Sequence, residues 1–334
     1  GNDSALACLS DQSRIIYDYF KQLFAQVTNP AIDSIREEVV MSLRCAIGPE
    51  GNLLINSAKN ANRLVIEHPI LTNEETLALK DCNHRGWTSK TIDITYDIDE
   101  GHKLSDMLDD ICEQSSQAIK NGHSLVILSD RKVNSSRGAI SALLASSAVH
   151  RYLVANHKRT QVGIIVETGE AREVHHFCLM IGFGADAVNP SLAFEALWQA
   201  RRDNLIKLED DVAIVAAYRK GVAKGMLKVM AKMGISTFSS YHGSMLFNSI
   251  GLSKQLQKKY FPYIINIPGS TNLKTLHKKN RKPIKTYSKL EEKIEDVLKF
   301  INKDVLEMGC VRMKNKDVID LYRKVEVGTL VLIK

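Results

Sequence analysis

Apolar and polar residues follow a regular order along this chain, and the order is clearest between residues 159 and 197. Residues 162–166 form a short run of mostly β-branched apolar residues, which is typical of a strand buried on both faces of a parallel sheet. From 172 to 181 the apolar positions recur at helical spacing, which predicts a helix. Residues 185–188 predict a second strand. A further helix is expected to begin at Pro190, because proline suits the first helical turn and disfavours helix in the residue before it.

The same alternation of strand and helix extends over much of the chain. Strands are predicted at 24–28, 91–96, 124–128 and 235–238, and helices at 103–120, 139–156 and 209–233. Strands that alternate with helices call for a mostly parallel sheet covered on both faces. The number of strands predicts an α/β fold in which the sheet forms a complete or partial (β/α) barrel.

The first ninety residues are less regular. Asp11 is expected to cap a helix that runs from Ile15 to Leu23, and another helix is predicted from Asp33 to Cys45. Residues 46–90 are rich in turn signals, apart from a short helix that Thr72 should cap.

Charge divides the chain into two parts. The formal net charge is +7, but residues 254–334 carry 19 Lys and Arg against 9 Asp and Glu, so this part alone has a net charge of +10. A basic tail can bind nucleic acid or an acidic partner. No recognisable nucleic-acid module accompanies it, so we expect no nucleic-acid partner.

The tail also differs from the rest of the chain in its pattern. Prolines and a glycine punctuate a basic linker from Pro262 to Lys285, which we expect to be mobile and to be cut first by proteases, between 266 and 288. Beyond it, Leu290 to Phe300 predicts a helix and Val325 to Ile333 a strand. We therefore divide the chain into a domain at 1–265 and a basic linker with a helix–strand extension at 266–334.

Composition excludes several classes of protein. With 44% hydrophobic and 25% charged residues the chain is an ordinary globular protein. No apolar run approaches the ~18 residues of a membrane span, and the N-terminus lacks a basic-then-apolar signal, so we expect no membrane partner. The six cysteines lie at least 30 residues apart, which argues against a local metal or iron–sulfur motif and for reduced thiols. We expect a cytoplasmic protein, or a plastid one if a targeting segment lies outside this sequence.

Polar residues follow most of the predicted strands. In a (β/α) barrel such residues gather on the rim where function lies. The candidate site residues are Thr28, Asn29, Ser129, Asp130, Glu167, Asn189, Ser236 and Thr237. They include no nucleophile beside a general base, so we assign no catalytic residue.

Three motifs suggest chemistry but favour structural roles. Residues 182–187 fit GxGxxA, but a dinucleotide site needs a strand before this motif and a helix after it, and here the order is reversed. His175 and His176 lack the spacing of helical metal ligands, so we expect them to be packed and assign no metal site. Ser129-Asp130 with His150 could suggest a hydrolase, but no GxSxG elbow is present.

A row of lysines recurs every four residues in the helix predicted at 209–233, at Lys220, Lys224, Lys228 and Lys232. The opposite side of that helix is apolar. Such a row can dock an acidic partner or hold an anion, whereas the simpler interpretation is the solvated face of an amphipathic helix.

Several runs of sequence, spread over residues 1 to 261, match one known family in order. They include YDYFKQLFAQVT from Tyr17, ILTNEE from Ile70, EVHHF from Glu173, GADAVNP from Gly184 and KVMAKMGIST from Lys228. These runs resemble the central domain of the large chain of glutamate synthase. The resemblance implies an aldolase-type barrel, and it does not extend to the last seventy or so residues.

In that family one chain carries a glutamine amidotransferase domain, the central domain, and a synthase domain that binds FMN and an iron–sulfur cluster. The resemblance implies a non-catalytic domain that connects the other two and helps to form an ammonia channel, with the candidate residues on an interface or on that channel. The partners would be those domains and a reductase subunit or domain. FMN and the cluster would belong to the full enzyme, with no cofactor in this fragment.

Two other interpretations stay open. One is a free-standing flavin-dependent barrel oxidoreductase, and the other is a basic-tailed binding module. The absorbance of bound flavin in the purified protein would separate the first of these from the non-catalytic domain.

Overall fold

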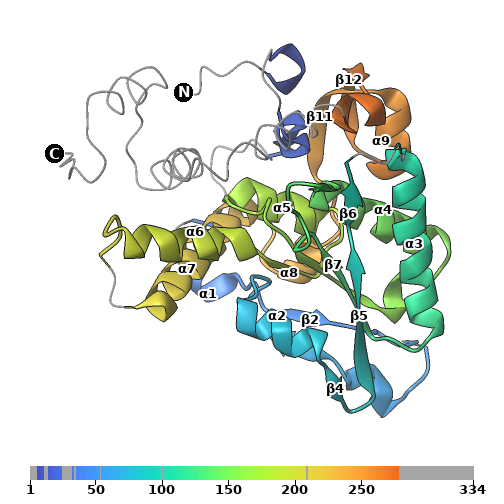
Figure 1. Cartoon of the computed structure of the whole chain (residues 1–334). Coiled ribbons are helices and arrows are strands. Elements are labelled where there is room, and N and C mark those ends of the chain that lie inside the picture. The colour runs from blue at the N-terminus through green and yellow to red at the C-terminus, as the bar shows by residue number, and fades with distance from the viewer. Residues whose placement is uncertain are drawn as a thin grey trace.

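A five-stranded sheet forms the centre of the computed structural model, which describes residues 6–10, 14–24, 32–33, 35–52, 54–98, 101, 103–207 and 210–277 (Figure 1). Its strands, in spatial order, are β10 (Ala187–Asn189), β9 (Gly163–Glu167), β7 (Leu125–Ser129), β5 (Trp87–Asp93) and β4 (Asn83–His84). The first four are parallel, and β4 pairs antiparallel with β5. The α/β class predicted from the sequence is confirmed.

Helices cover this sheet because its central strands are apolar on both faces. Every residue of β7 and β9 is buried. The long helices are α3 (Leu104–Lys120), α4 (Ala142–Ala155), α5 (Val174–Gly182), α6 (Ser191–Arg202) and α7 (Asp211–Lys232). Helix α4 lies against β7 and β9, and α3 lies against α4 and β5. These helices and the strands β7, β9 and β10 are confirmed to within a few residues of their predicted bounds.

The described strands do not close a barrel. Beyond β10 a single bridge joins Val188 to Ile70, and β4 forms the other edge of the sheet. The strand predicted at 235–238 is wrong, because Thr237 makes only one bridge, to Ser42, and Phe238–Tyr241 forms the short helix α8. Nearly all of the strand predicted at 24–28 lies outside the described residues.

A second sheet brings together the two ends of the described chain. It has the order β1 (Phe20–Gln22), β11 (Phe247–Leu252) and β12 (Ile265–Thr271), with β1 antiparallel and β12 parallel to β11. Aromatic rings pack beneath this sheet. The centre of the Phe20 ring lies 5.4 Å from the centre of the Phe183 ring and 4.8 Å from that of Phe261. In Figure 1 this sheet lies at the top of the molecule, beside α9 (Lys254–Tyr260).

Both helices predicted in the first fifty residues are wrong. In place of a helix from Ile15 to Leu23 there is one 3₁₀ turn, Ile16–Tyr19, followed by β1. In place of a helix from Asp33 to Cys45 only α1, Glu37–Val40, is helical. Residues 41–47 are then extended, and every second side chain points into the core. The buried residues are Met41, Leu43, Cys45 and Ile47. The end of this extended segment, β2 (Cys45–Ile47), pairs with β3 (Leu64–Ile66).

The linker predicted from Pro262 to Lys285 is wrong in its first half, because β12 occupies 265–271 and Leu276 is buried. The helix predicted at 290–300 and the strand predicted at 325–333 lie outside the described residues. The division at residue 265 stays a prediction.

Shorter elements complete the described chain. Helix α2 (Asn73–Lys80) begins with the expected cap, in which the Thr72 hydroxyl accepts a hydrogen bond from the Glu75 amide at 3.1 Å and Glu75 accepts one from the Thr72 amide at 2.8 Å. The strands β6 (Thr95–Asp97) and β8 (Arg137–Ala139) pair with each other. Three further 3₁₀ turns are Ala7–Leu9, Ala58–Ala61 and Arg159–Gln161. No helix in the described ranges is long and apolar enough to cross a membrane.

Candidate functional site

Four polar residues lie side by side at the carboxyl ends of the parallel strands. In the sheet register Asp93 on β5 is opposite Ser129 on β7, Ser129 is opposite Glu167 on β9, and Glu167 is opposite Asn189 on β10. We call these four residues the polar row. Parallel strands in register must bring their last residues together, so three of the predicted candidates, Ser129, Glu167 and Asn189, are neighbours. Asp93 was missed, because its strand ends earlier than predicted.

Glu167 is the centre of the polar row. Its carboxylate accepts a hydrogen bond from the Ser129 hydroxyl and forms an ion pair with Lys80, at 2.7 Å between Nζ and Oε2. The Glu167 side chain is only 7% exposed, so this carboxylate needs a close cation. A second cation, Arg131, has its Nε 4.0 Å from Oε1 of Glu167 and is also paired with Glu195. Removing Lys80 would leave a buried charge with a weaker, half-exposed partner.

Asp130 closes the turn that follows β9. It accepts a hydrogen bond from the Thr168 hydroxyl at 2.6 Å and another from the Gly169 amide at 3.0 Å. Burial raises the pKa of Asp130 above its ordinary value, although these two hydrogen bonds oppose the shift. The fourth predicted candidate is thus a buried group that fixes a loop.

Glu170, which the sequence did not single out, joins three separate segments. One of its oxygens accepts hydrogen bonds from the Tyr17 hydroxyl at 3.0 Å, the Ser141 hydroxyl at 2.9 Å and the Ala142 amide at 2.8 Å. It therefore ties the N-terminal segment to the start of α4, where a carboxylate is favourable. Burial, followed by the charge of Asp130, raises the pKa of Glu170 to about 7.

The two ends of the polar row also make contacts within the fold. Asn189 is fully buried, and its amide nitrogen donates at 3.0 Å both to the Leu71 carbonyl oxygen and to the Asn73 side chain, so β10 is linked to the start of α2. At the other end Asp93 forms an ion pair with Arg137 at 3.1 Å. Every member of the polar row therefore holds a neighbouring segment in place.

The remaining candidates do not join the polar row. Thr28 and Asn29 lie outside the described residues. The hydrogen bonds of the last two candidates go elsewhere: the Ser236 carbonyl oxygen accepts from the Ser42 amide, and the Thr237 hydroxyl lies 3.0 Å from that of Ser240. Their predicted place on the rim rested on a strand that is absent at 235–238.

A second charged group lies at the opposite, amino ends of β9 and β10. Arg159 pairs with Asp186 at 2.8 Å, and His242 lies 3.3 Å from the other oxygen of Asp186. Arg159 also donates to Nδ1 of His150 at 3.0 Å. Burial and the nearby Arg159 lower the pKa of His150 to about 3, so this ring is neutral. A pairing of His150 with Ser129 is wrong, because Ser129 lies at the carboxyl end of its strand.

The two other sequence motifs make contacts within the fold, and the predicted order around GxGxxA, a helix before it and a strand after it, is confirmed. The glycines of GxGxxA lie between the end of α5 and β10, and a Cβ on Gly184 would come within 2.1 Å of the His150 ring. His176 is buried and accepts from the Arg172 amide at 3.3 Å. His175 lies 3.3 Å from the Tyr17 carbonyl oxygen.

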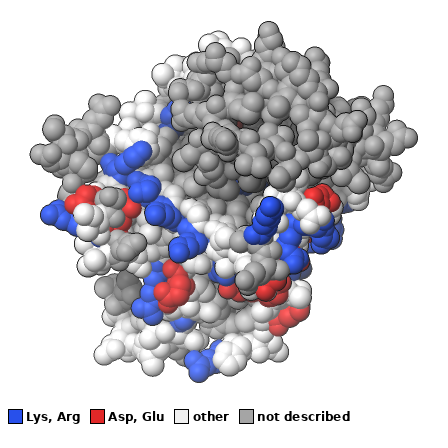
Figure 2. Space-filling view, turned by 90° about the vertical axis from the view of Figure 1, so that its left-hand side faces the viewer, with Lys and Arg blue, Asp and Glu red and all other residues white. Residues whose placement is uncertain are grey.

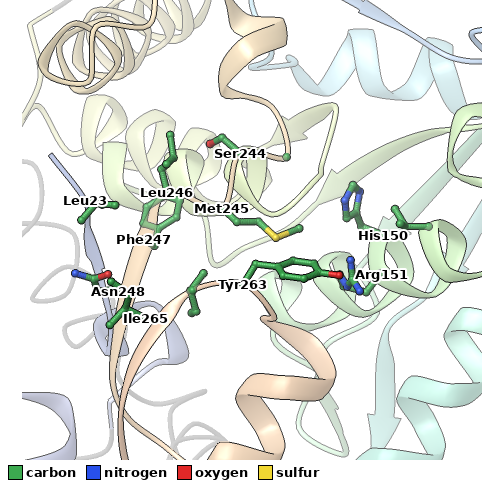
Figure 3. A pocket seen from close by; sticks show the side chains of 13 residues that line it. Leu23, His150, Arg151, Ser244, Met245, Leu246, Phe247, Asn248, Tyr263 and Ile265 are labelled. Atoms are coloured by element: carbon green, nitrogen blue, oxygen red, sulfur yellow. The ribbon is translucent and has the colours of Figure 1, made fainter. Parts of the chain in front are cut away.

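A shallow pocket of about 510 Å³ lies apart from the polar row, beside the second sheet (Figure 3). Its lining is mostly apolar and includes His150, Arg151, Met245 and Tyr263. The Arg151 guanidinium lies 5.1 Å from the centre of the Tyr263 ring. Met245 and Tyr263 both have left-handed backbone conformations, at φ 53° and 68°. No pattern in the sequence pointed to this pocket, because four distant segments form it.

The described residues that the sequence motifs suggested for a metal or a dinucleotide do not form such a site. No cluster of three or more His, Cys, Asp or Glu in the described ranges could hold a metal ion. The cysteines described are free and separate, with Cys45, Cys112 and Cys178 buried, and burial raises the pKa of each of these three thiols to about 12. The glycines at 182 and 184 pack against Phe247 and His150, so the GxGxxA motif does not offer open backbone to a flavin phosphate.

Known proteins resemble this chain over most of its length. The family model described as glutamate synthase central domain matches residues 1–253. Among similar proteins, glutamate synthase [NADH] of Schizosaccharomyces pombe is 47% identical over 266 residues, which are 78% of this chain and 13% of that protein. The large chain of glutamate synthase [NADPH] of Bacillus subtilis is 44% identical over 276 residues, 83% of this chain and 18% of that protein. The chloroplastic ferredoxin-dependent glutamate synthase of Spinacia oleracea is 38% identical over 289 residues, 83% of this chain and 18% of that protein.

Solved structures overlap with this chain only weakly. Inosine 5′-monophosphate dehydrogenase from Legionella pneumophila gives a TM-score of 0.31 at 9% identity, covering 72% of this chain and 99% of that one. A mutant flavocytochrome b2 with benzoylformate gives 0.34 at 8% identity, covering 68% of this chain and 75% of that one. Scores this low carry no argument about the fold.

The sequence relatives use NADH, NADPH or ferredoxin according to their names, and this chain spans less than a fifth of the length of each of the three described above. What they share with it is the region matched by the family model. The chain belongs to the glutamate synthase central domain family.

Proposed function

We propose that this chain is the non-catalytic central domain of a full-length glutamate synthase, in which it connects the glutamine amidotransferase and synthase domains and helps to form the ammonia channel. The observation that carries the proposal is the family match over residues 1–253, together with relatives that are more than five times longer than the matched region. In the full enzyme the synthase domain would hold FMN and an iron–sulfur cluster, and a reductase subunit or domain would supply electrons. The protein would be cytoplasmic, or plastid in a photosynthetic cell.

The polar row supports a positioning role at the carboxyl edge of the sheet. Ser129, Glu167 and Asn189 bind neighbouring segments of this chain, so the loops beyond them are held in fixed positions. Rigid loops at that edge suit a surface that must align two other domains. An incomplete aldolase-type barrel, open beyond β10 and β4, would leave sheet edges for those domains to cover.

The proposal is tested in the full-length enzyme with the variant Glu167→Gln. This change keeps the shape of the side chain and removes the charge that pairs with Lys80, so the loops at the sheet edge lose an anchor. We expect glutamine-dependent glutamate formation to fall more than ammonia-dependent formation, because only the first needs ammonia to pass between domains.

A matched control is Asp211→Asn, which removes a half-exposed partner of Arg201 on the surface of α7. It should leave the ratio of the two activities unchanged. Equal loss of both activities in Glu167→Gln would contradict a channel role, and glutamate synthesis by the isolated chain would contradict a non-catalytic domain.

A further inference from the structure

One face of α7 carries positive charge and has no acidic residue of its own. Eight residues of this helix are exposed: Val212, Ala216, Ala217, Lys220, Gly221, Lys224, Lys228 and Lys232. None of them is acidic. We call the four lysines the lysine ridge. Figure 2 shows the side of the molecule on which α6 and α7 lie, with a diagonal band of basic side chains across it.

The lysine ridge is only partly neutralised by the described residues. Lys228 pairs with Glu37 at 3.3 Å, and Lys232 lies 5.1 Å from the centre of the Phe24 ring. Lys220 and Lys224 form no ion pair or hydrogen bond with any residue that the structure describes. A solvated helix usually intersperses both signs of charge, because like charges four residues apart destabilise it.

A glycine beside the two unpaired lysines also indicates that this face of α7 is covered by another part of a protein. Glycine within a helix is destabilising relative to alanine. Gly225 has a packing reason, because a Cβ there would come within 2.3 Å of Val174. Gly221 has none among the described residues, because a Cβ there would meet no atom within 4 Å. Glycine at an exposed position of this kind permits the close approach of another backbone.

We propose that the lysine ridge binds an acidic α-helix belonging to another domain of the same full-length polypeptide, with Asp or Glu at four-residue spacing. The inference rests on the proposed function, because it gives that central domain one of its contacts. Successive lysines rise about 6 Å along the helix, which matches the rise between carboxylates four residues apart in a partner helix. The backbone of the partner would cross at Ala217 and Gly221, where no bulky side chain intervenes.

Two features favour this occupant over others. The chain spans 13% and 18% of two of its relatives, so most of a full-length polypeptide is available to cover this face at high effective concentration. Nucleic acid is disfavoured because the other exposed residues of α7 are Val212, Ala216, Ala217 and Gly221, whereas single-stranded nucleic acid is held by aromatic platforms and arginine.

The test is zero-length carbodiimide cross-linking of the full-length enzyme, which joins a lysine amine directly to a carboxylate in contact with it. We expect mass spectrometry to find Lys220 and Lys224 joined to carboxylates three or four residues apart, outside the region of residues 1–334 and in the same polypeptide. In the double variant Lys220→Gln/Lys224→Gln, amide hydrogen exchange on the exposed face of α7 should be faster than in the wild type.

A control variant, Lys90→Gln/Lys120→Gln, removes the same charge from exposed positions on β5 and α3 and should leave α7 unchanged. Cross-links from the ridge only to Glu37, or to a second polypeptide, would overturn the proposal. Binding of a 30-nucleotide single-stranded DNA that is lost in the ridge variant would overturn it in favour of nucleic acid. These outcomes differ from those that test the channel role, which depend on the ratio of two activities.

Discussion

Glu170 shows how strongly a single buried side chain can link the stability of this chain to pH. Its pKa of about 7 in the folded state lies above the 4.5 of a free glutamate, so the folded state holds the proton more tightly. Its contribution to the free energy of unfolding is complete below pH 4.5 and is lost as the pH rises through 7.

We therefore expect this contribution to fall by about 1 kcal/mol per pH unit between pH 5 and pH 7, and to change little above pH 8. The buried histidines act in the opposite direction below about pH 6.5, because burial lowers the pKa values of His150 and His176 and keeps both rings neutral in the folded state. The difference between the wild type and a Glu170 variant therefore isolates the effect of Glu170. The measurement is urea unfolding at several pH values. The variant Glu170→Gln should lose this slope, and an unchanged slope in the variant would assign it to another group.

The pair of Arg159 and Asp186 allows a second prediction for single residues. Both side chains are largely buried, at 15% and 11% exposure, so Asp186→Asn would leave a buried guanidinium without its counter-charge. We expect the free energy of unfolding to fall by about 3 kcal/mol. The comparison is Asp109→Asn, which breaks an exposed pair with Lys259 and should cost less than about 1 kcal/mol. Similar losses in the two variants, measured by denaturant unfolding, would mean that burial does not set the difference.

Secondary-structure elements differ in how far the sequence could predict them. The strands β7 and β9 are continuous apolar runs between helices of clear period, and both were predicted almost to the residue. Residues 41–47 also carry a clear pattern, but its period is two, and a helix assigned from Asp33 concealed it. Strand β12 was taken for a linker, because Pro268 and Gly269 are turn residues and five of its seven positions are exposed.

The residues of the candidate site also divide into those that a sequence pattern could predict and those that it could not. Ser129, Glu167 and Asn189 could be found because each follows a predicted strand, and parallel strands align their ends. Glu170 could not be found, because its partners come from the N-terminal segment and from the start of α4. Contacts between distant segments leave no periodic trace in the sequence.

Helix α2 provides a prediction at the scale of one element. Its capping box satisfies two amides that would otherwise lack partners, so Thr72→Ala should lower the free energy of unfolding by about 1 kcal/mol. Thr72→Ser retains the hydroxyl and should restore most of this loss. Hydrogen exchange at the Glu75 amide is the local measurement. Equal exchange rates in wild type and Thr72→Ala would contradict the role of the cap.

At the scale of the whole molecule, β12 extends the described fold beyond residue 261. Ile264 and Leu276 are buried and β11 pairs with β12, so a chain shortened to residue 261 loses a strand and part of the core. We expect a chain of residues 1–277 to melt at a higher temperature than a chain of residues 1–261. Calorimetry of the two truncated chains makes the comparison. Equal melting temperatures would mean that β12 adds nothing to the stability of the fold.

The second sheet also sets the order of events when this chain is made. Gln22 hydrogen-bonds to the carbonyl oxygen of Leu246, across 224 residues of sequence. At a synthesis rate of roughly 5–20 residues per second, the segment around Phe20 waits on the order of 10–45 seconds for its partner strand to leave the ribosome. During that time the aromatic rings of Tyr17, Tyr19 and Phe20, all buried in the finished fold, lack the strand β11 that completes their surroundings. Nascent chains halted before residue 246 should therefore be held by chaperones through their N-terminal aromatic segment, and release should follow translation of β11.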